Sequence, residues 1–123
     1  MNNKQRKVGL AGEKAACIFL ENLGYEILDT NYQCLFGEID IIARDQGTIV
    51  IVEVRARTSQ VFGGPEESIT DRKAQRLRRL ALDYLKTVSG RDISCRIDLI
   101  AVNLSKVNYS VEKVNHIRGI LAG

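Results

Sequence analysis

Two apolar runs near the middle of the chain predict a β-hairpin that carries acidic residues. Residues 37–57 read GEIDIIARDQGTIVIVEVRAR. In the first run, Glu38 and Asp40 alternate with apolar residues, and the second is almost wholly β-branched up to Glu53, which is typical of a strand covered on both faces. The RDQG segment between the runs is a turn signal. Glu38 and Asp40 share one face of the first strand, while Glu53 and Arg55 share one face of the second.

The register of this hairpin decides whether Asp40 meets Glu53. A four-residue turn over 45–48 places the two residues opposite each other, with their Cβ atoms about 4.5–5.5 Å apart. A three-residue loop ending at Gly47 pairs Asp40 with Val52 instead. We favour the first register, because two carboxylates that close can share a divalent cation and otherwise repel each other in a poorly hydrated sheet.

Helical periodicity flanks the hairpin on both sides. Apolar residues recur every three to four positions over 7–23, just before Gly24, and again over 69–88, which is the spacing of amphipathic helices. The buried stripe of the first helix is expected to contain Ala11, Ala15, Ile18, Phe19 and Leu23, and that of the second Ala74, Leu77, Ala81, Leu85 and Val88.

Shorter apolar runs predict the remaining strands. They cover 25–29, 94–102 and 107–114. Residues 115–121 are expected to form a short turn or helix. Residues 58–68 contain the only proline and a Gly-Gly pair, which indicates a loop beside the acidic strand. The 123 residues, 45% of them hydrophobic, are expected to form a single domain with one sizeable core.

Cysteine usage and the absence of targeting segments indicate a reduced, cytoplasmic protein. Cys17, Cys34 and Cys95 are odd in number and far apart, without the spacing of a zinc site or a disulfide framework. The basic start of the chain is followed by Glu13 and Lys14 before an apolar run of signal-peptide length develops. No stretch is long enough to span a membrane, so we expect no membrane partner.

Basic residues are concentrated at the start of the second predicted helix. The formal net charge is only +3, but five of the eight residues in 72–79 are positive. Such a helix face is either a solvated surface or a phosphate-binding surface, and the second interpretation favours a nucleic-acid partner, DNA above all. The expected nucleic-acid contacts are Arg57, Arg72, Lys73, Arg76 and Arg79.

The sequence argues against two common catalytic mechanisms. Serine or cysteine hydrolysis needs a histidine base, and His116 is the only histidine and lies near the end of the chain, with no nucleophile-elbow motif in the sequence. A phosphate-cradling GxxxxGK loop is absent too. Carboxylates in a sheet, next to Arg55 and a basic helix, match metal-dependent cleavage of a phosphodiester.

The carboxylates divide into expected ligands and expected structural groups. Asp40 and Glu53 supply the hard oxygen ligands that Mg²⁺ or Mn²⁺ prefers. Glu13 either completes this metal site or is a solvated glutamate in the first turns of a helix. Asp98 lies in the apolar run 94–102 and is expected to pair with a neighbouring arginine or a backbone donor.

These motifs carry a resemblance over nearly the whole chain. Glu13 on a first helix, then GEIDIIA, IVEVRAR and a basic helix beginning near SITDRKAQRL resemble the YraN family of small bacterial proteins, with the restriction-endonuclease-like PD-(D/E)XK fold related to archaeal Holliday junction resolvases. The resemblance implies an α/β fold in which helices flank a mixed β-sheet. It also implies that Glu13, Asp40 and Glu53 occupy acidic metal-site positions, and that Arg55 stands in the signature lysine position.

Three functions remain open, and Arg55 bears on the choice between the first two. Arg55 can stabilise negative charge on a phosphate but stays protonated, so it cannot act as a general base. One hypothesis is a Mg²⁺- or Mn²⁺-dependent endonuclease that hydrolyses DNA, including branched DNA, with Glu13, Asp40, Glu53 and Arg55 as its catalytic residues. Another is a nucleic-acid-binding module that does not cleave, and a third is a domain whose basic helix binds an acidic protein. A homodimer is expected only by analogy with resolvases.

Overall fold

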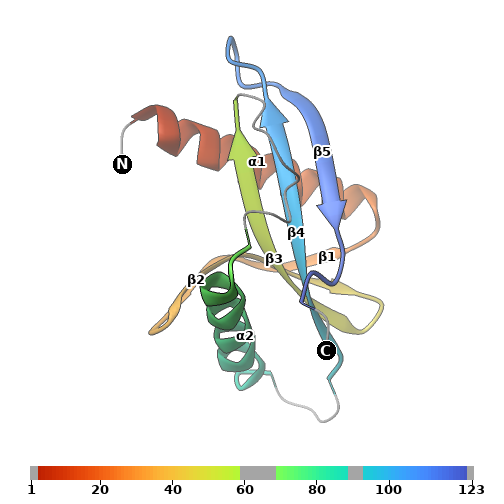
Figure 1. The fold of residues 1–123 in the computed structure, drawn as a ribbon. Helices are drawn as coiled ribbons and strands as arrows, with labels where there is room; N and C mark the ends of the chain where they lie inside the picture. Colours follow the sequence, from red (N-terminus) through yellow and green to blue (C-terminus); the bar gives the residue numbers. More distant parts are fainter. Residues whose placement is uncertain (1–2, 59–68, 89–92, 122–123) are drawn as a thin grey trace.

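The computed structural model describes residues 3–58, 69–88 and 93–121, in which a five-stranded sheet carries helices on its faces (Figure 1). The helices and strands of these residues are α1 (Asn3–Asn22), β1 (Glu26–Cys34), β2 (Gly37–Asp45), β3 (Thr48–Arg57), α2 (Asp71–Leu85), β4 (Cys95–Leu104) and β5 (Val111–Ile117). The α/β fold implied by the resemblance, a mixed sheet flanked by helices, is confirmed.

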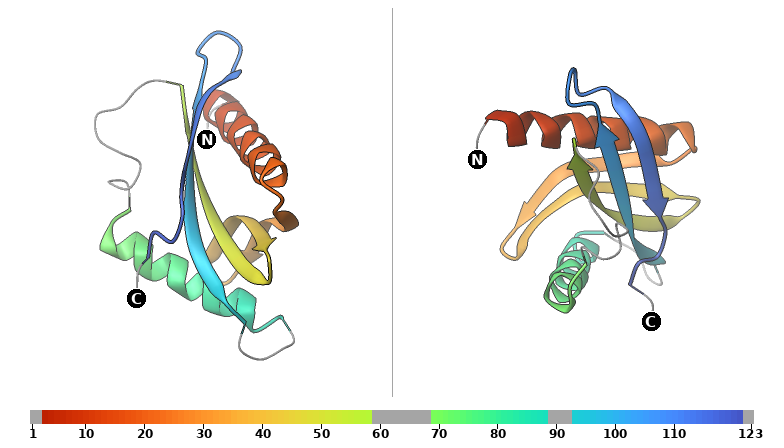
Figure 2. Two further views of the ribbon diagram at one scale, coloured as in Figure 1. Left: turned by 90° about the vertical axis from the view of Figure 1, so that its right-hand side faces the viewer. Right: turned by 45° about the horizontal axis from the view of Figure 1, so that its top comes forward.

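The sheet has the strand order β1-β2-β3-β4-β5. The neighbours β3 and β4 are parallel, and the other neighbouring pairs are antiparallel. A parallel pair needs a crossover connection, and α2 lies within it. The two faces of the sheet are covered by different helices: α1 packs on one hydrophobic cluster and α2 on the other, as the edge-on view in Figure 2 shows.

The outer strands differ from the sequence prediction in their lengths. β1 continues to Cys34 because it pairs with β2 along the hairpin between them. β5 begins at Val111 rather than Val107, and residues 115–117 continue this strand instead of forming a turn or helix, because Ile117 pairs with Leu99 of β4. Of the predicted loop, residues 59–68 lie outside the described part of the chain.

The favoured hairpin register is confirmed. Asp45 pairs with Thr48 and Ile41 with Val52, which is the register that aligns Asp40 with Glu53, although the pairing ends one residue before these two. The turn between β2 and β3 is formed by Gln46 and Gly47, whose φ angles of 49° and 90° are both positive, as a type I′ hairpin turn requires.

Pairing between β2 and β3 stops at Ile41 and Val52. β3 nevertheless continues to Arg57 with β4 on its other side, while β2 stays paired with β1 and bends away. Ile39 consequently packs in the cluster under α2, and Ile41 in the cluster under α1, which breaks the simple alternation expected along β2. The divergence leaves an edge of β3 that side chains can reach.

A line of small and apolar residues fixes α1 against the sheet. The fully covered positions are Gly12, Ala16 and Leu20. The predicted stripe was wrong at Ile18 and Leu23, which are 50% and 54% exposed. The physical reason is the close approach at Gly12, which rotates the contact line of the helix toward the glycine.

We expect Gly12→Ala to lower the free energy of unfolding by about 1–3 kcal/mol, the usual cost of overpacking. A Cβ at Gly12 would overlap the Cβ of Ala56 and lie 3.6 Å from its Cα, so α1 would have to move away from β3. Gly9→Ala is the matched control, because no atom lies within 4 Å of a Cβ built there and alanine favours the helix. Urea denaturation of both variants tests the prediction. Equal stabilities would contradict it.

α2 begins at a capped end and buries one side. The Thr70 hydroxyl accepts a hydrogen bond from the backbone N–H of Lys73 (3.2 Å), which is a standard N-cap interaction. Leu77, Leu80 and Ala81 are the buried residues of this helix. Among the described residues, neither helix is both long and apolar enough to cross a membrane.

Candidate active site

The two acids expected to bind a metal, Asp40 and Glu53, lie together where β2 leaves β3. The two carboxylates lie close enough for the charge of Glu53 to raise the pKa of Asp40. Asp40 Oδ2 accepts a hydrogen bond from the backbone N–H of Val54 (2.8 Å). The aspartate therefore provides a hydrogen-bond partner for a backbone donor of β3 that β2 no longer pairs with. Glu53 is only 7% exposed. The site therefore holds two carboxylates in a poorly hydrated part of the sheet.

Two positively charged side chains lie against Glu53. Arg55 Nη2 and Lys73 Nζ are each 3.2 Å from Glu53 Oε2. Arg55 comes from the same strand, whereas Lys73 reaches the site from the first turn of α2. The Nε of Arg55 is buried and has no hydrogen-bond partner in the described part of the chain. The site thus contains a buried donor next to its carboxylates, of the kind that binds an anionic oxygen.

A third acid, Glu13, approaches from α1 and is held by Asn31. The amide nitrogen of Asn31 donates to Glu13 Oε1 (3.1 Å) and Glu38 Oε1 (2.6 Å). Burial raises the pKa of Glu13; the Asn31 hydrogen bond opposes the rise and the charge of Glu38 adds to it. Glu13 therefore lies within the acidic site rather than on a solvated helix face.

The environment of Asp40 favours its protonated form. Burial raises the pKa of Asp40 to about 7, against the opposing hydrogen bond from Val54, and the charges of Glu53 and Glu13 contribute to the rise. Poorly compensated charge of this kind is common at functional sites. A cation bound at Asp40 would compensate this charge.

The raised pKa predicts a pH dependence of stability. Because the pKa of Asp40 is higher in the folded than in the unfolded chain, its contribution to stability is fully present below about pH 4 and is lost as the pH rises through about 7. In EDTA, Asp40→Asn should therefore gain stability relative to the wild type between pH 4 and 8. Urea denaturation across this range measures the difference, and a constant difference would contradict the prediction.

A cleft opens beside the acids, between the start of α1 and the end of β3. It has a volume of about 710 Å³. Glu13 and Asp40 line it together with the cationic residues Lys4, Arg55 and Arg57. The expected nucleic-acid residue Arg57 thus lies next to the acids. The cleft combines acidic side chains with positive side chains that suit a phosphate backbone.

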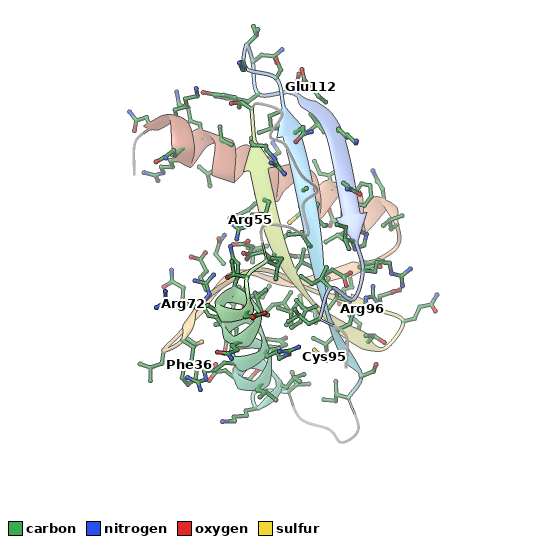
Figure 3. The ribbon with its side chains drawn as sticks, viewed as in Figure 1. Phe36, Arg55, Arg72, Cys95, Arg96 and Glu112 are labelled. Carbon is green, nitrogen blue, oxygen red and sulfur yellow. The ribbon has the colours of Figure 1, made fainter. Side chains whose placement is uncertain are left out.

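The other expected phosphate contacts lie on α2. Arg72, Arg76 and Arg79 are exposed and line a groove of about 930 Å³ that also includes Lys73. In Figure 3, Arg55, Arg72 and Phe36 follow one another down the left side of the view, whereas Arg96 lies on the right. Lys73 connects this groove to Glu53.

The donor set fits a divalent cation at the carboxylate pair. Mg²⁺ is commonly bound by one or two carboxylates, with water and substrate phosphate as further ligands. Asp40 and Glu53 offer such a pair, and Glu13 lies further out, held by Asn31. Within residues 3–58, 69–88 and 93–121, no group of three or more Asp, Glu, His or Cys side chains is close enough to form a metal centre, so substrate oxygens would have to complete the coordination.

Asp98 belongs to a separate, structural network. Its carboxylate is fully buried and accepts hydrogen bonds from Arg96 (3.1 Å) and the Gly119 backbone N–H (2.9 Å), with His116 Nε2 at 2.8 Å. Burial acts to raise the pKa of Asp98, but these hydrogen bonds outweigh it and lower the pKa. The expected pairing with an arginine and a backbone donor is confirmed.

Sequence reasoning missed two parts of the acidic site. Asn31 lies in β1 with a φ of 52°, a left-handed conformation that asparagine tolerates better than most residues. Lys73 was grouped with the exposed arginines of α2, but its side chain is only 17% exposed and contacts Glu53. The position of Lys73 in the first turn of α2 was the available signal for this residue. No pattern in the sequence indicated Asn31.

Comparisons with known proteins identify the family of this chain. Residues 12–102 match the model of "Uncharacterised protein family UPF0102", so the chain belongs to the UPF0102 family, the family expected from the sequence as YraN. A UPF0102 protein of Desulforamulus reducens is 45% identical over 98% of this chain and 100% of its own length. A UPF0102 protein of Moorella thermoacetica is 49% identical over 86% of this chain and 88% of its own.

Proposed function

We propose that this UPF0102 protein is a metal-dependent endonuclease that hydrolyses DNA phosphodiesters, with a site of the PD-(D/E)XK type. One observation carries the proposal: the carboxylates of Asp40 and Glu53 lie together at the point where β2 and β3 diverge, with the side chains of Arg55 and Lys73 against Glu53. A buried acidic pair next to cations is costly for stability alone but suits a reaction on a phosphate.

The chain's own residues have separate roles in this reaction. Asp40 and Glu53 would hold Mg²⁺ or Mn²⁺, with Glu13 orienting the shell. When bound, the ion would acidify the attacking water and offset charge on the phosphate. Arg55 would stabilise negative charge on the phosphate, and its Nε–H has no hydrogen-bond partner among the described residues. Lys73 supplies the ammonium group that the signature has in the position of Arg55.

The cleavage reaction is tested by incubating the purified protein with duplex, single-stranded and branched DNA, and with RNA, in Mg²⁺, Mn²⁺ or EDTA. Internal cleavage of DNA in Mn²⁺ and none in EDTA is the expected result. Products that shorten from the ends would contradict an endonuclease. RNA cleavage in preference to DNA would contradict the proposed substrate.

A non-catalytic nucleic-acid-binding module is the second candidate, and the contacts of Glu53 favour it. Glu53 Oε2 is already paired with both Arg55 and Lys73, so a metal has to compete with two cations for this carboxylate. DNA binding without cleavage under every metal condition would support this candidate and contradict the nuclease.

Both candidates require phosphate contacts by α2. Binding to duplex DNA should weaken with salt, with a log–log slope of about 0.9 per phosphate contact. Replacing both Arg76 and Arg79 by alanine should lower this slope by up to about two, because both side chains are exposed and line the groove. Fluorescence anisotropy at several salt concentrations measures the slope.

The matched control for this prediction replaces Lys106 and Lys113, two exposed lysines at the β4–β5 end of the sheet, by alanine. Their removal changes the net charge equally but should leave the slope unchanged. If the two double variants lower the slope by the same amount, binding depends on net charge and the basic face of α2 has no specific role.

A further inference from the structure

The turn between β1 and β2 carries two large apolar residues at the surface. Cys34 pairs with Gly37, so Leu35 and Phe36 form the turn. Leu35 is 94% exposed and Phe36 39%. Tight turns usually consist of glycine, asparagine, aspartate, proline or serine, and Gly37, with a φ of 133°, already supplies the conformational freedom. Turn formation therefore does not explain an exposed Leu-Phe pair.

Contacts with α2 hold this turn in a fixed position. The Tyr32 hydroxyl donates a hydrogen bond to Asp83 (2.8 Å), and the ring of Tyr32 packs edge-to-face on Tyr84, with centroids 5.3 Å apart. The guanidinium of Arg79 lies 5.2 Å from the centre of the Phe36 ring. The turn projects beyond α2 at the lower left of Figure 1. These contacts hold Leu35 and Phe36, which form the apolar tip of the turn, in a fixed position.

The charges around the tip select one kind of occupant. Phe36 lines the same groove as Arg72, Arg76 and Arg79, and this groove continues to Lys73 at the acidic site. A second copy of this chain would bring like charges together around the tip. A nucleic acid offers phosphates for the arginines and, where a base is unpaired, an apolar face for the tip.

We propose that Leu35 and Phe36 form a stacking platform for an unpaired base, so that the protein prefers DNA with an unpaired nucleotide to continuous duplex. The inference rests on the nucleic-acid binding included in the proposed function. The arginines of α2 bind the flanking phosphates, and the tip contacts the exposed base. The groove then leads the adjoining backbone toward Lys73 and Glu53.

The test measures binding in EDTA, so that cleavage does not contribute. Two probes are compared by fluorescence anisotropy: a duplex, and the same duplex with one unpaired 2-aminopurine. The wild type should bind the second probe at least about fivefold more tightly, the scale of one base stacked on a side chain, and should quench its 2-aminopurine fluorescence. Leu35→Ser should lose this preference and the quenching while its affinity for duplex stays within about twofold.

Val107→Ser is the matched control. Val107 is 92% exposed in the turn between β4 and β5, at the opposite end of the sheet (Figure 1), and this variant should behave as the wild type. Equal wild-type affinities for the two probes, or a preference that survives in Leu35→Ser, would overturn the inference. So would a change from dimer to monomer on Leu35→Ser in sedimentation velocity, because the tip would then be a contact between copies.

The cleavage assay separates this inference from the proposed function. A preference for the unpaired probe without cleavage in any metal would overturn the nuclease proposal and leave the stacking platform standing. Metal-dependent cleavage without such a preference would overturn the stacking platform alone.

Discussion

Asp40→Asn is expected to lower the rate of DNA cleavage in Mn²⁺ by at least about a thousandfold, because a carboxylate–metal contact contributes several kcal/mol to the transition state. Asparagine has nearly the same shape and can still accept the hydrogen bond from the Val54 N–H, so the fold should be kept. Rates under saturating DNA and metal measure the effect.

Asp29→Asn is the control for this prediction, since Asp29 is an exposed carboxylate on β1. It should cleave as the wild type does. If Asp40→Asn retains wild-type activity, the observed cleavage does not come from the acidic pair, and a contaminating nuclease or a structural role for Asp40 becomes the explanation.

Lys73→Met is expected to lower the cleavage rate by about a hundredfold, the scale of one preorganised contact to the transition state. Lys73 Nζ lies 3.2 Å from Glu53 Oε2, which places an ammonium group directly beside the acidic pair. Methionine preserves most of the side-chain volume and removes the charge. The effect should therefore appear in the rate at saturating DNA rather than in affinity.

Arg55 gives the contrasting result. Arg55→Lys should keep most of the activity, because Lys73 already supplies an ammonium group and Arg55 contributes charge. The control for Lys73→Met is Lys86→Met, which removes an equal charge at the far end of α2, outside the site. This control variant should leave the rate unchanged. A Lys73→Met variant as active as the wild type would show that Lys73 is not needed for cleavage. A large gain of activity in Arg55→Lys would show that Arg55 had replaced an essential lysine.

The central hairpin could be predicted from sequence because its determinants are local. Side chains alternate along each strand in the paired part of the hairpin, so a one-residue slip would turn its buried apolar side chains to the opposite face. The turn at Gln46 and Gly47 then leaves one register that pairs Asp45 with Thr48. Carboxylate chemistry and strand geometry therefore predict the same register of the hairpin.

The rest of the site depends on how distant elements pack. Lys73 contacts Glu53 only because α2 crosses the sheet with its first turn over β3, and helix periodicity alone does not give this angle. Asn31 reaches Glu13 through a left-handed residue within β1. The rotation of α1 depends on one close contact between Gly12 and Ala56. Each of these features joins residues far apart in the sequence.

Anomalous diffraction from crystals soaked in Mn²⁺ at pH 8, where Asp40 is ionised, tests the central claim most directly. The claim is that Asp40 and Glu53 form the site of the divalent ion. An anomalous peak bonded to carboxylate oxygens of both residues is the predicted result, with Asp40→Asn crystals as the control that should lose it. A fully loaded Mn²⁺ site elsewhere, with no peak at this pair, would contradict the claim.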